Sequence, residues 1–133
     1  MPKQPTIFLI DDDIDDQEIF LYVMKKIVPE ATYVFARDGM DGLEKINEGS
    51  FKADVIFLDV NMPRMDGLEC LTELRKINSL EHVPIYIYST SGELDMPEKC
   101  KTLGCTGFIK KHINTDDVKK EFEKIIANIS LAE

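Results

Sequence analysis

Residues 54–67 read DVIFLDVNMPRMDG. The stretch contains a short apolar run, Val55 to Leu58, which ends at Asp59 and leads into a loop with a proline and a glycine. A run this short, rich in Val, Ile and Phe and without polar alternation, is typical of a strand covered on both faces. The stretch therefore predicts a buried strand that carries an aspartate at its carboxyl end.

Similar apolar runs recur on either side of this stretch. They are Thr6 to Ile10, Thr32 to Ala36, Ile85 to Tyr88, and Thr106 to Ile109. Apolar residues at helical spacing lie between and after the runs. These stripes extend from Ile19 to Val28, Met40 to Ile46, Leu71 to Ile77, Met96 to Leu103, and Val118 to Ile129.

Start signals support several of the predicted helices. Asp66 precedes the third helix, and Asn114 or Thr115 opens the fifth, with acidic residues in its first turn. Pro97 fits only the first turn of the fourth helix. Five strands that alternate with five helices predict an α/β fold, a doubly wound five-stranded parallel sheet with helices on both faces.

Residues 1–133 read as one domain. The length suits a single core, and we find no linker, repeat or low-complexity segment. No apolar stretch approaches the length of a membrane span, and residues 1–6 lack the apolar core of a signal peptide. We therefore expect a cytoplasmic protein without a membrane partner.

The charge of the chain argues against a nucleic-acid partner. Sixteen Lys and Arg oppose 25 Asp and Glu, giving a net charge of -9, which repels nucleic acid and anionic membranes.

Three cysteines, Cys70, Cys100 and Cys105, lie in apolar surroundings and cannot all pair with one another. We expect reduced, packed thiols.

Polar residues follow the predicted strands. Asp11 and Asp12 follow the first, Asp59 the third, Ser89 the fourth and Lys111 the fifth. In doubly wound folds, ligands bind beyond the carboxyl ends of the strands. Carboxylates packed together raise one another's pKa unless a cation lies among them, and an acidic pocket without His or Cys suits Mg²⁺.

The same residues suit phosphoryl transfer. This reaction depends mainly on positioning and on neutralising charge at the phosphoryl oxygens. Lys111 and the metal supply positive charge, the Ser89 hydroxyl can bind a phosphoryl oxygen, and Asp59 can be the nucleophile, giving an acyl phosphate. The product is a charge that can be switched on and off.

Four segments, FLIDDD, DVIFLDVNMPRMDG, PIYIYSTS and GCTGFIKK, make the chain resemble the receiver domains of two-component response regulators over essentially its whole length. The resemblance implies a flavodoxin-like strand order of 2-1-3-4-5. It also implies phosphorylation on Asp59 and a Mg²⁺ site formed by Asp11, Asp12, Asp59 and the backbone carbonyl of Asn61. Catalytic roles would fall to Asp59, Ser89 and Lys111, and switch roles to Ser89 and Phe108.

Two positions depart from the family pattern. His112 follows Lys111 where the family usually has proline, and Thr90 occupies a position where Ala or Gly is frequent. We expect a trans Lys111–His112 peptide, because a non-proline cis bond costs about 2.5–4 kcal/mol. Asn61 and Ser91 occupy the two positions that tune hydrolysis in the family. Lys110 should point to the face opposite Lys111.

Several other polar and aromatic residues fit ordinary structural roles rather than a functional site. Asp13, Asp15 and Asp16 are expected as the cap and first-turn acids of the first helix. A calcium loop starting at Asp11 is excluded, since its sixth position is not glycine and its twelfth is not glutamate. His82 and His112 are isolated and expected at the surface or in loops. Phe108 taken alone is more typical of a core residue than of a switch, and its place beside the strand ends that carry Ser89 and Lys111 makes the two interpretations equal.

The leading hypothesis is a stand-alone response regulator, a signalling switch rather than an enzyme with a separate substrate. Its phosphoryl donor would be a sensor histidine kinase or a histidine phosphotransfer protein, and its output an unidentified protein partner. A receiver-like scaffold that ignores phosphorylation is the second hypothesis. A phosphohydrolase or flavin enzyme is the third, disfavoured because no Gly-rich phosphate loop is present and residues 59–61 lack a second acid.

Overall fold

The computed structural model describes residues 4–90, 96–111 and 114–129, which form a five-stranded sheet and its covering helices. All strand pairs are parallel, and the strand order is β2-β1-β3-β4-β5, as predicted. The elements are β1 (Thr6–Ile10), α1 (Ile14–Lys25), β2 (Thr32–Ala36), α2 (Gly39–Glu48), β3 (Val55–Leu58), α3 (Gly67–Leu74), a 3-10 turn (Asn78–Leu80), β4 (Ile85–Ser89), α4 (Met96–Thr102), β5 (Gly107–Lys110) and α5 (Thr115–Ile129).

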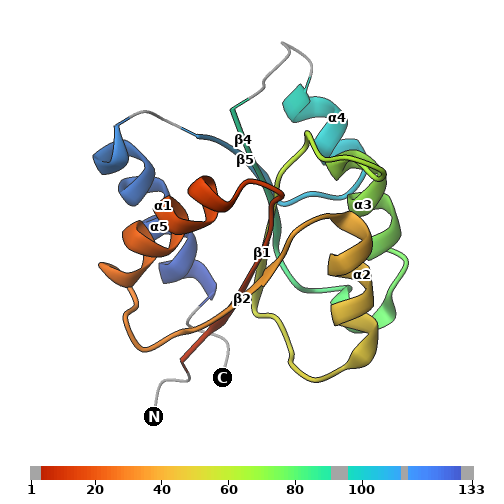
Figure 1. Ribbon diagram of the computed structural model, residues 1–133, viewed down its shortest axis with the longest axis horizontal. Coiled ribbons are helices and arrows are strands. Elements are labelled where there is room, and N and C mark those ends of the chain that lie inside the picture. Colours follow the sequence, from red (N-terminus) through yellow and green to blue (C-terminus); the bar gives the residue numbers. More distant parts are fainter. Residues whose placement is uncertain (1–3, 91–95, 112–113, 130–133) are drawn as a thin grey trace.

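The helices form two layers, one on each face of the sheet (Figure 1). Helices α1 and α5 cover one face, while α2, α3 and α4 cover the other. Each interface has its own apolar core. One contains Phe20, Phe57 and Phe122, whose rings pack edge to face, and the other contains Phe8, Leu58 and Leu71.

Strand register brings the ends of β1 and β3 together. Ile10 lies opposite Ala36 of β2 and Leu58 of β3. The ladder continues one residue further, because the amide of Asp59 donates to the carbonyl of Ile10 at 2.9 Å and the amide of Asp11 donates to Ala36 at 3.0 Å. The first residues after both strands are therefore hydrogen-bonded to the sheet.

Several predicted boundaries were wrong. Helix α1 ends at Lys25, so Ile27 and Val28 lie beyond it, although both still pack on the core beneath α1 and α5. Helix α3 ends at Leu74, before Ile77. A hydrophobic stripe marks residues that face the core, and a loop leaving a helix can keep facing it. Ser89 belongs to β4, and β5 begins at Gly107 rather than Thr106.

Strand β2 also differs from its prediction. Only Ala36 at its end is fully buried, and the residues before it are half-buried or exposed. The strand lies at an edge of the sheet, beside β1 alone. An edge strand is less completely covered than a central one, and composition alone did not distinguish the two.

Helix caps were predicted more closely. Asp66 caps α3 in a reciprocal capping box with Glu69, and the Asn114 side chain accepts the amide of Asp116 at 2.8 Å ahead of α5. Pro97 lies in the first turn of α4.

The three cysteines are buried free thiols. Within the described ranges, no helix has the length and apolar character needed to cross a bilayer.

Candidate phosphoacceptor and metal site

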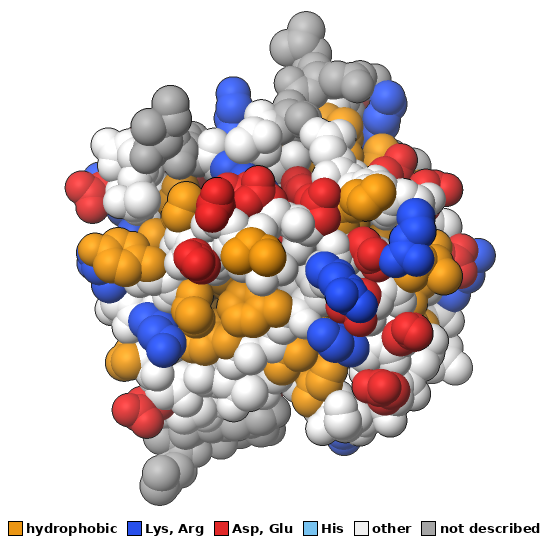
Figure 2. Space-filling model, in the orientation of Figure 1, with side chains coloured by type: hydrophobic (Ala, Val, Ile, Leu, Met, Phe, Trp, Pro, Cys, Tyr) orange, Lys and Arg blue, Asp and Glu red, His pale blue; other side chains and the backbone are white. Residues whose placement is uncertain are grey.

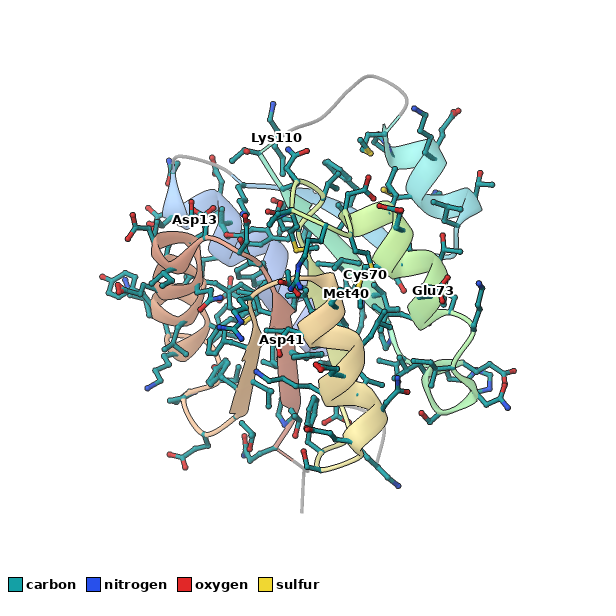
Figure 3. All side chains as sticks on the ribbon, turned by 45° about the vertical axis from the view of Figure 1, so that its right-hand side comes forward. Asp13, Met40, Asp41, Cys70, Glu73 and Lys110 are labelled. Atoms are coloured by element: carbon teal, nitrogen blue, oxygen red, sulfur yellow. The ribbon has the colours of Figure 1, made fainter. Side chains whose placement is uncertain are left out.

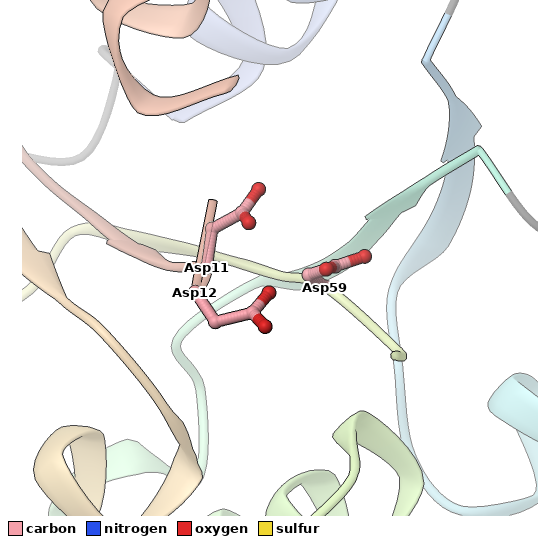
Figure 4. Close-up of side chains that lie close together, drawn as sticks. All are labelled: Asp11, Asp12 and Asp59. Atoms are coloured by element: carbon pink, nitrogen blue, oxygen red, sulfur yellow. The ribbon is translucent and has the colours of Figure 1, made fainter. Parts of the chain in front are cut away.

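Three carboxylates meet where β1 and β3 end. Oxygens of Asp11, Asp12 and Asp59 lie within 4.8 Å of one another, and Figure 4 shows their side chains converging. Asp11 and Asp59 are buried, whereas Asp12 is exposed. Figure 2 shows several acidic side chains, coloured red, in a row across the upper part of the visible face. The predicted clustering of carboxylates is therefore present.

The ammonium of Lys111 lies among these carboxylates. It contacts Asp11 Oδ2 and Asp16 Oδ2, each at 2.8 Å, and lies 3.8 Å from Asp59 Oδ1. The backbone amide of Lys111 donates to the carbonyl of Ser89 at 2.9 Å. This hydrogen bond extends the β4–β5 ladder and holds the backbone of Lys111 beside β4. Lys111 is 8% exposed, so the ammonium is largely removed from water.

The neighbouring lysine is directed elsewhere. Lys110 is exposed, and Figure 3 shows its side chain pointing away from the body of the domain. Successive residues of a strand point to opposite sides, which separates Lys110 from Lys111. As predicted, Lys110 points away from the side of the strand that Lys111 occupies, while the role assigned to Lys111 stays a prediction.

Asp59 has two further neighbours. Its Oδ1 accepts the backbone N–H of Val60 at 2.9 Å, and the buried hydroxyl of Ser89 donates a hydrogen bond to its carboxylate. Asp11 is similarly tied, since its Oδ1 accepts the backbone N–H of Asp13 at 3.0 Å. The site is thus built from the carboxyl ends of β1, β3, β4 and β5.

Burial governs the electrostatics of the site. It raises the pKa of Asp11 from the ordinary 3.8 to about 6, although Lys111 and the amide of Asp13 act in the opposite direction. Burial likewise raises the pKa of Asp59, against the charge of Lys111 and the hydrogen bond from Ser89. For Lys111, burial disfavours the charged form, but the bonds to Asp11 and Asp16 outweigh it and raise its pKa.

The loop after Asp59 is held by close backbone packing. A Cβ on Gly67 would lie 2.2 Å from the carbonyl oxygen of Asp59, so only glycine fits there. The amide of Gly67 donates to the carbonyl of Val60 at 2.7 Å. Arg64 adopts a φ of 68° and its guanidinium binds the carboxylate of Asp38, the N-cap of α2. These contacts connect the loop that contains Asn61 to two helices.

The remaining site predictions have different outcomes. Phe108 is half-buried and packs against the core formed with α2, α3 and α4, while Thr90 is exposed at the end of β4. His82 is exposed, as predicted. Ser91, His112 and the Lys111–His112 peptide lie outside the described residues.

The side chains present fit a hard divalent cation. The cluster offers carboxylate oxygens and neither His nor Cys, and this donor set suits Mg²⁺ rather than zinc or copper. The raised pKa values of Asp11 and Asp59 show that Lys111 alone does not compensate their burial. A cation among the carboxylates would favour their charged forms.

Sequence reasoning recognised only one of the two roles of Asp16. It does lie in the first turn of α1, where Asp13 is the N-cap, as expected. It also binds Lys111, 95 residues away along the chain. Residues 11–16 contain five aspartates, and no pattern among them distinguished the one that reaches β5.

Comparison with known proteins identifies the family. The model of the response regulator receiver domain matches residues 7–123. Hybrid signal transduction histidine kinase B of Dictyostelium discoideum is 30% identical over 129 residues, covering 87% of this chain and 6% of its own length. A cyclic di-GMP phosphodiesterase response regulator of Xanthomonas campestris, RpfG, is 26% identical and is covered over 31% of its length, against 90% of this chain. The chain thus spans less than a third of these curated relatives.

Solved structures agree on the fold. The Mn²⁺-bound form of response regulator Rcp1 superposes with a TM-score of 0.82 at 24% identity, over 97% of this chain and 96% of its own. The Vibrio cholerae chemotaxis protein CheY4 gives a TM-score of 0.80 at 24% identity, over 92% and 99% of the two chains. At this level of identity the likeness concerns the arrangement of the sheet and helices.

Proposed function

Because this chain belongs to the response regulator receiver domains of two-component signalling, we propose that it acts as a phosphorylation switch. Asp59 receives the phosphoryl group, and a Mg²⁺ ion held by Asp11, Asp12, Asp59 and the backbone carbonyl of Asn61 assists. The donor is a phosphohistidine of a sensor kinase or a histidine phosphotransfer protein. The result is a change in the surface that a protein partner reads.

One observation carries the proposal. A buried aspartate with a raised pKa lies beside two further carboxylates, a buried hydroxyl and a buried ammonium, although these groups come from the ends of four different strands. Burying so much charge is costly, and purely structural packing does not require it. Perturbed ionisable groups that converge in this way mark functional sites.

The chemistry needs no separate general acid or base. An oxygen of the Asp59 carboxylate attacks phosphorus and an O–P bond forms. The N–P bond of the donor breaks, and its electron pair remains on the imidazole of the donor histidine. Asp59 must be ionised to attack, so its raised pKa makes a nearby positive charge important. Mg²⁺, when bound, neutralises charge on the phosphoryl oxygens.

Ser89 and Lys111 have distinct roles in this proposal. The Ser89 hydroxyl, which binds the Asp59 carboxylate in the resting protein, moves its hydrogen bond to a phosphoryl oxygen. The Lys111 ammonium, 3.8 Å from Asp59, approaches a second phosphoryl oxygen. Movement of Ser89 at the end of β4 lets Phe108 of β5 move inward, which alters the surface formed by α4, β5 and α5.

Intact-mass measurement tests the proposal. The protein is incubated with acetyl phosphate and Mg²⁺, with Asp59→Asn as the control. We expect the wild type to gain one phosphoryl group in a Mg²⁺-dependent manner and the variant to gain none. Equal labelling of both proteins would place the phosphoryl group elsewhere. An unlabelled wild type that still binds partners would favour a receiver-like scaffold.

A further inference from the structure

The contact between Lys111 and Asp16 is a strong interaction of the site that phosphoryl chemistry does not require. Asp16 lies outside the carboxylate cluster, in the first turn of α1, yet its Oδ2 is as close to the ammonium as that of Asp11, at 2.8 Å. Asp59 is farther, at 3.8 Å. The ammonium is therefore displaced toward α1 and away from the residue that accepts the phosphoryl group.

We propose that Asp16 is a positioning residue that retains Lys111 in the resting state and competes with the phosphoryl group for its ammonium. This inference rests on the proposed function. Charge-assisted hydrogen bonds of this length are among the stronger polar contacts in proteins. At 3.8 Å from Asp59 Oδ1 the ammonium makes no direct hydrogen bond to Asp59, and its bond to Asp16 opposes any movement toward a phosphoryl group there.

The role of Asp16 increases when the cation binds. Asp11 and Asp59 belong to the cluster that suits a divalent cation, so their charges are then shared with the metal. Asp16 is not part of this cluster. It becomes the carboxylate that remains fully available to Lys111, and it is only 30% exposed, so water weakens the pair less than at an open surface. A phosphoryl group on Asp59 then offers the ammonium new oxygens.

The environment of Lys111 leaves few other positions for its charge. Its side chain is 8% exposed, and the ring of Tyr88 lies 5.2 Å from the ammonium on the side of the α1 and α5 core. The ammonium is thus confined between the carboxylates and an apolar wall. Asp16 and the phosphoryl group then compete for the charge of this ammonium, and Asp16 sets part of the free energy of switching.

Fluoroberyllate, a stable mimic of the phosphoryl group, provides the test. Its affinity is measured by calorimetry at saturating Mg²⁺ for the wild type, Asp16→Asn and Asp15→Asn. Asp15 is exposed in the same turn of α1, so Asp15→Asn removes the same charge without the contact to Lys111. We expect Asp16→Asn to bind about fivefold more tightly than Asp15→Asn, the range of a partly exposed ion pair.

A double-mutant cycle separates this role from a general electrostatic effect. In a Lys111→Ala background, Asp16→Asn should change fluoroberyllate affinity by less than about twofold, because the competing group is gone. An unchanged or weaker affinity of Asp16→Asn relative to Asp15→Asn overturns the inference, as does an equal gain without Lys111. A wild type that binds no fluoroberyllate and gains no phosphoryl mass overturns the proposed function as well.

Discussion

Replacing Asp11 with asparagine should stabilise the metal-free protein at neutral pH. Asp11 is fully buried, and burial raises its pKa from 3.8 to about 6. Between these values, the folded protein binds more protons than the unfolded chain, so the free energy of unfolding falls as the pH rises. The rise of the Asp11 pKa from 3.8 to about 6, at about 1.4 kcal/mol for each tenfold change in the proton-binding constant, lowers the free energy of unfolding by about 3 kcal/mol at pH 7.

Asparagine resembles the protonated form of Asp11, so the stability gained by Asp11→Asn depends on pH. Well below pH 3.8, where Asp11 is protonated in both the folded and the unfolded state, the variant should be as stable as the wild type. The difference should develop between about pH 4 and pH 6 and remain constant above it. Mg²⁺ should reduce it, because a cation that binds the folded wild type stabilises it by mass action, and the variant offers a poorer site.

Urea unfolding in EDTA at pH 4, 5, 6 and 7.5, repeated with Mg²⁺, measures both effects. Asp15→Asn, an exposed change of the same charge, should alter stability by less than about 0.5 kcal/mol. The reasoning is refuted if Asp11→Asn is no more stable than the wild type at pH 7.5 in EDTA. It is also refuted if a gain of the same size persists at pH 4.

Three further outcomes follow from the geometry of the site. Gly67→Ala should destabilise the protein by about 3 kcal/mol in urea unfolding, because its Cβ would overlap the carbonyl oxygen of Asp59; a loss below about 1 kcal/mol would contradict that close approach. Asp12→Asn should weaken Mg²⁺ binding in calorimetric titration by roughly tenfold or more, since even residues that contact a metal only indirectly contribute about that factor. Equal Mg²⁺ affinity in the variant and the wild type would remove Asp12 from the metal site. Lys111→Ala should still accept a phosphoryl group by mass but lose the amide shifts that fluoroberyllate induces outside the pocket, whereas Lys110→Ala should keep them; the reverse result would show that the lysine was assigned wrongly.

Local sequence patterns determined most of the secondary structure. Short apolar runs marked all five strands, and apolar stripes marked the helices between them, because burial against one face of a helix or both faces of a strand imposes a characteristic spacing. Capping also depends on neighbours in the sequence, and Asp66 was predicted correctly for that reason. Boundaries were less accurate, since Ile27 and Val28 face the core from a loop rather than from α1.

The convergence of the acidic pocket also followed from the sequence, through topology. The carboxyl ends of parallel strands lie at one edge of the sheet, so residues that follow β1, β3 and β5 were expected to meet. Asp11, Asp59 and Lys111 do meet, and their side chains lie within 4 Å of the Lys111 ammonium. The resemblance to receiver domains added the strand order, which the structure confirms.

Only the tertiary structure decided which of the neighbouring acids binds Lys111. Asp13, Asp15 and Asp16 lie in the same turn, and all three suit the amino-terminal end of α1. The choice of Asp16 depends on how α1 is rotated against a strand that begins more than 80 residues later, and that rotation is set by core packing beneath α1 and α5. The same limit applies to Arg64 and Asp38, which meet across 26 residues. Contacts between distant side chains depend on how whole elements pack, and local spacing in the sequence does not encode that arrangement.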